Sequence, residues 1–212
     1  MRELEVASHF PDLSWRWYND IPLLKGIYHF KTEYRGVPLQ DSFNLEFNFP
    51  VDYPDKPPLV RELDNKIPAL FHRNPDGYLC LCTPVEQHLT FLQEPTLESF
   101  ILNLLNPYLI SWLWYDSFSE MPWGERRHGS MGLVESYRDL LKLKDIRHTI
   151  SFMLEYVRNK IHHKENCPCG SGLSFKKCHG NIVSKYEDSL PKGQLIYDFV
   201  YIVGGLNEKY FN

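Results

Sequence analysis

Residues 43–60, FNLEFNFPVDYPDKPPLV, pass from an alternating pattern into a run of prolines. Across residues 43–49 a bulky apolar residue alternates with Asn or Glu, which is typical of a strand with one buried face. The prolines from Pro54 to Pro58 have no backbone N–H to offer a sheet ladder. We therefore expect the chain to leave the sheet after Phe49 and to run extended over the surface.

Further elements are predicted on both sides of this stretch. Apolar or small residues recur with period two across residues 24–34, and residues 36–38, Gly-Val-Pro, supply a turn between the two strands. Residues 97–105 have apolar residues at helical spacing, with Pro95 near the start and Pro107 as the expected stop. These patterns predict an α+β fold, in which an antiparallel meander sheet is flanked by helices.

Composition and charge exclude several classes of protein. The 212 residues, 43% hydrophobic and 15% aromatic, suffice for one good core and a small appendage. The chain has 23 Lys and Arg against 27 Asp and Glu, and it has no basic block that could follow a phosphate backbone. Its start lacks the apolar core of a signal peptide, and its apolar runs fall short of the roughly 18 residues of a membrane span. We expect a cytoplasmic protein that binds neither nucleic acid nor membrane.

The five cysteines fall into two clusters. The first lies in FHRNPDGYLCLC, residues 71–82, where Cys80 and Cys82 follow a turn-forming Asn-Pro-Asp-Gly. A thiolate accepts an acyl group readily and a thioester surrenders it readily, so one cysteine can mediate two transfers without a cofactor. The alternative is that both cysteines are small buried hydrophobic residues.

The order of these features resembles the ubiquitin-conjugating enzymes, the UBC-like family. YPDKPPLV (residues 53–60) is similar to the family's Tyr-Pro-x-x-Pro-Pro-x-Val stretch, and GYLCL (residues 77–81) to its Gly-x-Ile/Leu-Cys-Leu active site. The resemblance covers about residues 22–107. It implies that Cys80 carries a ubiquitin-like modifier by its C-terminus as a thioester and then passes it to an amine. Cys82 stands where the family usually has an acidic or other residue.

One departure from that family lies just upstream of the cysteine. The family has His-Pro-Asn, whereas this chain has His72, Arg73 and Asn74, without the proline and two residues nearer Cys80. Asn74 is a candidate for stabilising the oxyanion, and His72 is a second candidate catalytic residue. An equal alternative is that both belong to a hydrogen-bonded turn before Pro75. The departure resembles bacterial relatives, which often lack the Asn and recruit other residues.

Residues 122–137, PWGERRHGSMGLVESY, contain three glycines around His128. They predict a tight loop whose backbone approaches another group closely, and the loop resembles one found in bacterial members of the family. His128 is a weaker candidate for proton transfer beside the thioester, because imidazole titrates near neutrality. A lone histidine more often satisfies local hydrogen bonds.

The second cysteine cluster is CPCGSGLSFKKCHG, residues 167–180. Cys-x-Cys, eight residues and Cys-His resemble the SEC-C zinc motif, best known at the C-terminus of the bacterial protein-export motor. A disulfide would leave one cysteine unpaired, and Cys-x-Cys is too short for an unstrained bridge. Three thiolates and one imidazole make a closed shell typical of structural zinc, which would supply most of the folding free energy of so short a segment. The predicted Zn²⁺ ligands are Cys167, Cys169, Cys178 and His179.

Together these patterns predict a UBC-like conjugating domain over residues 1–142, a connector helix over residues 143–165 and a zinc module with a tail over residues 166–212. The tail fits a helix or a strand equally. The expected function is that of a bacterial conjugating enzyme whose partners are an activating enzyme, a ubiquitin-like modifier and a protein target. The resemblance alone suggests a setting in antiphage defence. Two alternatives are a non-catalytic adaptor that docks partners through its zinc module, and a cysteine hydrolase pairing Cys80 with His72 or His128.

Overall fold

The structure, a computed structural model, describes residues 9–18, 21–158, 161–186, 189–190 and 192–210. Its contacts divide the chain into two compact units. The sheet unit consists of Met1–Cys82 and Thr90–Glu125, and the helical unit of Thr83–Leu89 and Arg126–Asn212. The functional domains predicted from the sequence, with boundaries at residues 142 and 165, remain a prediction. Within the described residues, no helix has both the length and the apolar character needed to span a membrane.

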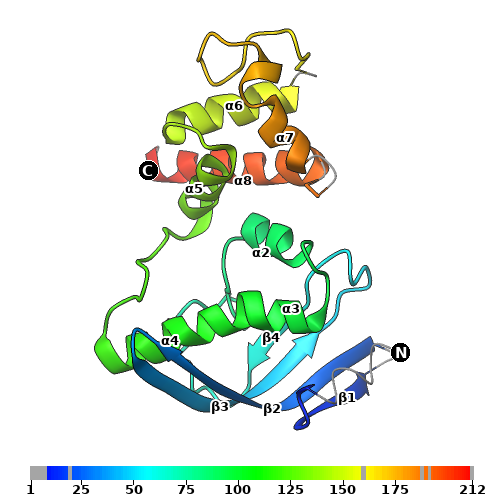
Figure 1. The fold of residues 1–212 in the computed structure, drawn as a ribbon, viewed down its shortest axis with the longest axis vertical. Coiled ribbons are helices and arrows are strands. Elements are labelled where there is room, and N and C mark those ends of the chain that lie inside the picture. The colour runs from blue at the N-terminus through cyan, green and yellow to red at the C-terminus, as the bar shows by residue number, and fades with distance from the viewer. Residues whose placement is uncertain (1–8, 19–20, 159–160, 187–188, 191, 211–212) are drawn as a thin grey trace. The chain divides into compact units, whose positions relative to one another are not determined.

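A four-stranded antiparallel sheet in the order β1-β2-β3-β4 forms the base of the sheet unit (Figure 1). Its strands are β1 (Leu13–Tyr18), β2 (Ile21–Tyr34), β3 (Val37–Asn48) and β4 (Leu59–Glu62). The predicted α+β class is confirmed, and the two predicted strands lie largely within β2 and β3. Between β2 and β3 the chain turns at Arg35 and Gly36, whose φ angles are 50° and 78°. The predicted turn at residues 36–38 was therefore placed slightly too late.

Alternation in β3 places its large side chains in the core of the sheet unit. Phe43, Leu45 and Phe47 are each 0% exposed. The proline-rich residues 49–58 lie outside the sheet, as expected, but residues 51–56 form turns rather than the expected extended run. The chain then returns as β4, where Val60 pairs with Phe47. The proline-rich segment thus follows the end of β3 and connects it to β4.

One prediction about the sheet unit is wrong, because Pro107 does not end a helix. α3 (Leu97–Phe100) continues through a π-helical turn, η1 (Ile101–Leu105), into α4 (Asn106–Phe118). In the π turn the Asn106 N–H donates to the Ile101 carbonyl. This widened turn accommodates the proline ring, which would otherwise clash with the preceding turn and which has no N–H to donate. α4 then lies along one face of the sheet, in contact with β2 and β3 (Figure 1).

The helical unit contains α5 (Gly129–Leu141), α6 (Ile146–Arg158), α7 (Gly180–Tyr186), α8 (Lys192–Tyr210) and the 3-10 turn η2 (Phe175–Lys177). α2 (Pro84–Phe91) contributes its first two turns. α5, α6 and α8 pack on one another. The tail, which fitted a helix or a strand equally, is the helix α8. The largest fully buried side chains of this core are Tyr137 and Phe152.

The glycine-rich segment around His128 is helical over much of its length rather than a tight loop. α5 begins at Gly129, and Gly132 lies inside it. A Cβ on Gly132 would meet the Arg127 carbonyl oxygen at 1.8 Å. The close backbone approach predicted for this segment therefore occurs, between Gly132 and the Arg127 carbonyl. Gly132 lies within a helix, however, and not in a loop.

Candidate metal centre and cysteine site

The predicted metal ligands are brought together by a looped segment before α7. The Cys167 N–H donates to the Leu173 carbonyl at 2.8 Å, and the Gly170 N–H donates to the Cys167 carbonyl at 3.1 Å. Gly170 and Gly172 have φ angles of 79° and 75°, which glycine adopts without steric cost. These turns reverse the direction of the chain. Cys178 and His179, which directly follow η2, therefore lie next to Cys167 and Cys169.

The four ligand atoms form a compact group. They belong to Cys167, Cys169, Cys178 and His179, and all lie within 4.8 Å of one another. Cys167 Sγ lies 3.3 Å from His179 Nδ1, and Cys178 Sγ lies 3.1 Å from the same nitrogen. Tetrahedral coordination with metal–sulfur bonds of about 2.3 Å separates ligand atoms by about 3.5–3.8 Å. The two measured distances are a few tenths of an ångström shorter than these values, and the donor set and its compactness suit a single metal ion.

Neighbouring groups hydrogen-bond to these ligands, and burial shifts the pKa values of two of them. The Ser171 hydroxyl lies 3.3 Å from Cys178 Sγ. His179 also hydrogen-bonds to the backbone of Leu141 and Lys142 at the end of α5, although burial outweighs these bonds and lowers the pKa of its imidazole. A neutral imidazole held through its second nitrogen is the usual arrangement of a metal-binding histidine. Burial raises the pKa of the Cys167 thiol to about 11, so a bound cation would have to displace its proton.

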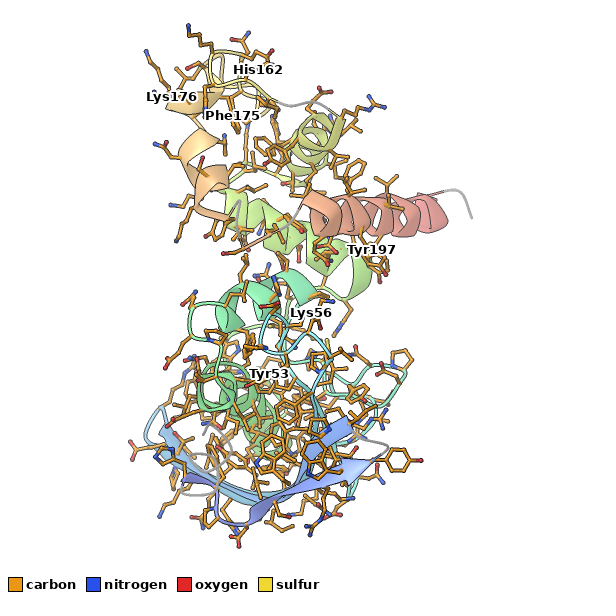
Figure 2. All side chains as sticks on the ribbon, turned by 90° about the vertical axis from the view of Figure 1, so that its right-hand side faces the viewer. Tyr53, Lys56, His162, Phe175, Lys176 and Tyr197 are labelled. Atoms are coloured by element: carbon orange, nitrogen blue, oxygen red, sulfur yellow. The ribbon has the colours of Figure 1, made fainter. Side chains whose placement is uncertain are left out.

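The metal-binding loop is part of the core of the helical unit. Cys167 and Phe175 are buried in the same apolar cluster as Phe152. The Phe152 ring lies 5.2 Å from the His179 ring, centroid to centroid. Figure 2 labels Phe175 beside Lys176 and His162 at this end of the unit. The loop thus has more apolar support than its sequence suggested.

Cys80 lies at the end of a short hairpin formed by residues 72–80. The Cys80 N–H donates to the His72 carbonyl at 2.7 Å, and the Asn74 N–H donates to the Tyr78 carbonyl at 2.8 Å. Gly77, with φ 87°, closes the turn. The Leu79 N–H donates to a β4 carbonyl at 2.9 Å, so the hairpin is tied to the sheet.

A buried ion pair holds the same hairpin from its other arm. The Arg73 guanidinium donates to the Ile67 carbonyl at 2.8 Å and lies 3.4 Å from Glu62 Oε2. The Glu62 side chain is 0% exposed and the Arg73 side chain 11%. Because Glu62 belongs to β4, this pair fixes the arm opposite Cys80 to the edge of the sheet.

The Cys80 thiol is partly buried. Burial raises the pKa of this thiol, so the protonated form predominates at neutral pH. Its Sγ lies 3.9 Å from the Cys82 carbonyl oxygen. From α4, the Tyr108 hydroxyl donates to the Phe71 and His72 carbonyls at 3.1 and 3.3 Å. The backbone next to the hairpin is thus hydrogen-bonded to α4, and the sulfur is partly shielded from water.

The other predicted catalytic residues lie in different settings. The His72 ring packs edge-on against Phe71 at 4.9 Å and lies 3.8 Å from a Glu125 carboxylate oxygen. Asn74 is exposed at the hairpin turn. His128 belongs to the helical unit, where it is the exposed N-cap residue of α5. The hairpin thus brings Cys80, His72 and Asn74 into one element of the sheet unit, whereas His128 belongs to the helical unit.

Sequence reasoning missed the groups that hold this hairpin, namely Glu62, Arg73 in its pairing role and Tyr108. No local motif marks them, because each acts on a residue distant in sequence.

Comparison with known proteins bears on the metal centre. Residues 164–181 match the family model of the SEC-C motif, so the chain carries a SEC-C motif at the place where its cysteine spacing predicted one. No curated protein and no solved structure matches the chain. The matched segment contains all four candidate ligands and does not extend to the Cys80 hairpin.

Proposed function

We propose that this protein is a conjugating enzyme of the UBC-like class, which carries a ubiquitin-like modifier as a thioester on Cys80. The supporting observation is a partly exposed cysteine on a hairpin tied to a four-stranded antiparallel meander and backed by a long helix. This order of elements agrees with the resemblance in residues 22–107. A bacterial setting in antiphage defence rests on that resemblance alone.

The reaction has two balanced steps. The Cys80 sulfur attacks the carbonyl carbon of a modifier thioester on an activating enzyme, a new C–S bond forms, and the donor sulfur leaves and takes up the proton. An amine of the target then attacks the same carbon, an amide forms, and the Cys80 thiol is regenerated. Neither step needs an oxidant or a cofactor on this chain.

The environment of Cys80 favours holding an acyl group over reacting rapidly with water. A thiol whose pKa is raised by burial is a poorer leaving group, and partial burial limits the approach of water. The same raised pKa slows attack by the free thiol. We therefore propose that the donor complex supplies the base for loading, and that His72, Asn74 and His128 are candidates for assisting transfer.

The metal centre has a structural role in this proposal, and its ion is Zn²⁺. Cysteine and histidine ligands in a closed set of four favour zinc among the common divalent ions and leave no position open for substrate. The exposed face of this loop, which includes His162 and Lys176, is a candidate docking surface for a protein partner.

A chemically defined donor tests the proposal without knowledge of the natural modifier. The protein is incubated with a small-thiol thioester of a peptide that ends in Gly-Gly, and intact mass spectrometry follows the adduct. We expect one acyl adduct on Cys80, released by excess thiol, absent in Cys80→Ala and retained in Cys82→Ser. Adduct formation that is equal in Cys80→Ala and wild type would contradict the assignment.

The non-catalytic adaptor is the second candidate, and the raised pKa of the Cys80 thiol favours it. An adaptor predicts that Cys80→Ala keeps every biological function of the wild type. A hydrolase predicts steady release of the free peptide acid with no accumulating adduct. The acyl donor experiment therefore separates carrier from hydrolase, and the Cys80→Ala phenotype separates carrier from adaptor.

A further inference from the structure

The C-terminal end of α4 and the residues after it carry exposed aromatic side chains. Tyr115, Phe118 and Trp123 are 42%, 48% and 54% exposed, and all three belong to the sheet unit. A single exposed apolar side chain is ordinary, but several large ones in one short segment point to an interaction surface. Together these three side chains are the aromatic patch.

The β2–β3 turn lies beside this end of α4 and supports the aromatic patch (Figure 1). The Tyr34 ring packs edge-on against the Trp114 ring at 5.1 Å and against the Trp123 ring at 5.3 Å, centroid to centroid. The Tyr34 hydroxyl donates to the Pro122 carbonyl at 3.1 Å. The Phe118 ring lies 4.4 Å from the Trp114 ring. The rings are thus held in place before a partner binds, which lowers the entropic cost of association.

The formal charges of this part of the sheet unit have one sign. Thr90–Glu125 contains no Lys or Arg, and its acidic residues are Glu94, Glu98, Asp116, Glu120 and Glu125. Asp116 and Glu120 are exposed and lie between Tyr115 and Trp123 in the chain. The Trp114 indole N–H donates to Glu120 Oε1 at 3.3 Å, which places this carboxylate at the aromatic patch. Within the residues that the structure describes, neither Asp116 nor Glu120 makes an ion pair.

One arginine from the β2–β3 turn contacts the rings that support the patch. Arg35 Nη2 donates to the Pro122 carbonyl at 2.8 Å. Its guanidinium carbon lies 5.2 Å from the Tyr34 ring centroid and 5.7 Å from the Trp114 ring centroid, distances typical of cation–π contacts. These rings therefore already hold one cationic side chain of this chain on their faces.

We infer that the aromatic patch, together with Asp116 and Glu120, is a docking surface for a protein segment rich in lysine and arginine. Aromatic rings pack against the apolar stems of such side chains and attract their charged ends. The two carboxylates supply the complementary charge. A second copy fits less well, because a two-fold interface brings the same carboxylates together.

One edge of this surface lies next to the hairpin that carries Cys80. The Tyr115 ring lies 5.4 Å from the ring of Phe71, and the carbonyl of the next residue, His72, accepts the Cys80 N–H. The inference nevertheless goes beyond the proposed function, because binding at the aromatic patch does not require Cys80 to react.

Two matched peptides test the charge preference of the surface. One is a short dye-labelled peptide of Lys, Arg and Leu, and the other has Glu in place of every Lys and Arg. Fluorescence anisotropy measures the Kd of each for the full chain. We expect the basic peptide to bind and the acidic one not to bind. The affinity should fall as salt rises from about 0.05 to about 0.5 M, because the Debye length shortens.

Variants that remove charge locate the site. Asp116→Asn combined with Glu120→Gln keeps the shape of both side chains and the acceptor for the Trp114 N–H. This double variant should weaken binding of the basic peptide by about 3- to 10-fold. The control is Asp55→Asn combined with Glu94→Gln, which removes two exposed carboxylates elsewhere in the sheet unit. It changes the net charge equally and should keep the wild-type affinity.

A second pair of variants tests the aromatic contribution. Phe118→Ala should weaken binding by about 5-fold or more, since exposed aromatic anchors often dominate an interface. Trp17→Ala, which removes a 65% exposed ring from β1, should leave the affinity unchanged. Circular dichroism confirms that each variant is folded.

Three outcomes overturn the inference. The first is a basic peptide that does not bind, or that binds no better than the acidic one. The second is an equal loss of affinity in the two double variants. The third is dimerisation of the peptide-free protein that Phe118→Ala abolishes in analytical ultracentrifugation, because the surface then belongs to a second copy. None of these results bears on whether Cys80 accepts an acyl group.

Discussion

At the scale of single residues, the Cys80 thiol and its burial give a pH-dependent contribution to stability. Burial raises its folded-state pKa, whereas the unfolded thiol keeps its ordinary pKa of about 8.5. The stabilisation from keeping this group protonated is therefore complete below that ordinary value and is lost as pH rises through the raised folded pKa. We expect wild type to lose stability relative to Cys80→Ser on going from neutral to alkaline pH, as measured by urea unfolding. A constant difference between the two proteins would mean that the thiol is not buried in solution.

The Glu62–Arg73 pair gives a second prediction at the scale of residues. Glu62→Ala should destabilise the sheet unit by about 3–5 kcal/mol, because removing one partner leaves the other charge buried and uncompensated. Asp52→Ala, which breaks the exposed pair with Lys56 at 2.7 Å, is the control and should cost at most about 1 kcal/mol. Chemical unfolding followed by tryptophan fluorescence measures both. Equal losses would show that the Glu62 pair is solvated.

At the scale of elements, glycine has opposite effects at two helical positions. A Cβ on Gly132 in α5 would meet the Arg127 carbonyl, whereas Gly204 in α8 has nothing within 4 Å of its Cβ position. Gly132→Ala should therefore destabilise the helical unit, and Gly204→Ala should stabilise it by up to about 1 kcal/mol through helix propensity. Thermal unfolding followed by circular dichroism gives the sign of each change. Stabilisation by Gly132→Ala would show that the Arg127 carbonyl does not lie against Gly132 in solution.

Local sequence patterns predicted some of the observed strands and helices and not others. The alternation in residues 43–49 predicted a strand because one buried face imposes its period on the strand itself. The short strands β1 and β4 were not predicted, since four to six residues carry too little periodicity and their pairing depends on β2 and β3. The effects of Pro107 and Gly132 also depend on structure that the local pattern does not show. Proline normally ends a helix, but the π turn before Pro107 accommodates its ring. Glycine normally interrupts a helix, but at Gly132 the absence of a side chain makes room for the Arg127 carbonyl.

At the scale of the whole molecule, the candidate metal ligands could be read from the sequence and the groups around Cys80 could not. Ligands only twelve residues apart in sequence, from Cys167 to His179, must meet locally, so their spacing specifies the cluster. The Tyr108 hydroxyl and the His72 carbonyl that it contacts belong to residues 36 positions apart, and no local motif links them. Contacts between residues so distant in sequence are therefore visible only in the folded chain.

Two separate cores predict that loss of the metal affects one unit more than the other. Cys167 and Phe175 lie in the core of the helical unit, and metal binding stabilises only the state that presents its ligands. All five tryptophans (Trp15, Trp17, Trp112, Trp114 and Trp123) lie in the sheet unit, so their fluorescence reports on that unit alone. Chelation should lower the unfolding midpoint seen by circular dichroism, which follows the helices, while the tryptophan transition stays in place. His179→Ala should behave like the chelated protein, and Lys177→Ala, an exposed neighbour in the same loop, like wild type. If the tryptophan transition falls by the same amount, the two units unfold as one cooperative unit, and the expectation that the metal stabilises the helical unit alone is wrong.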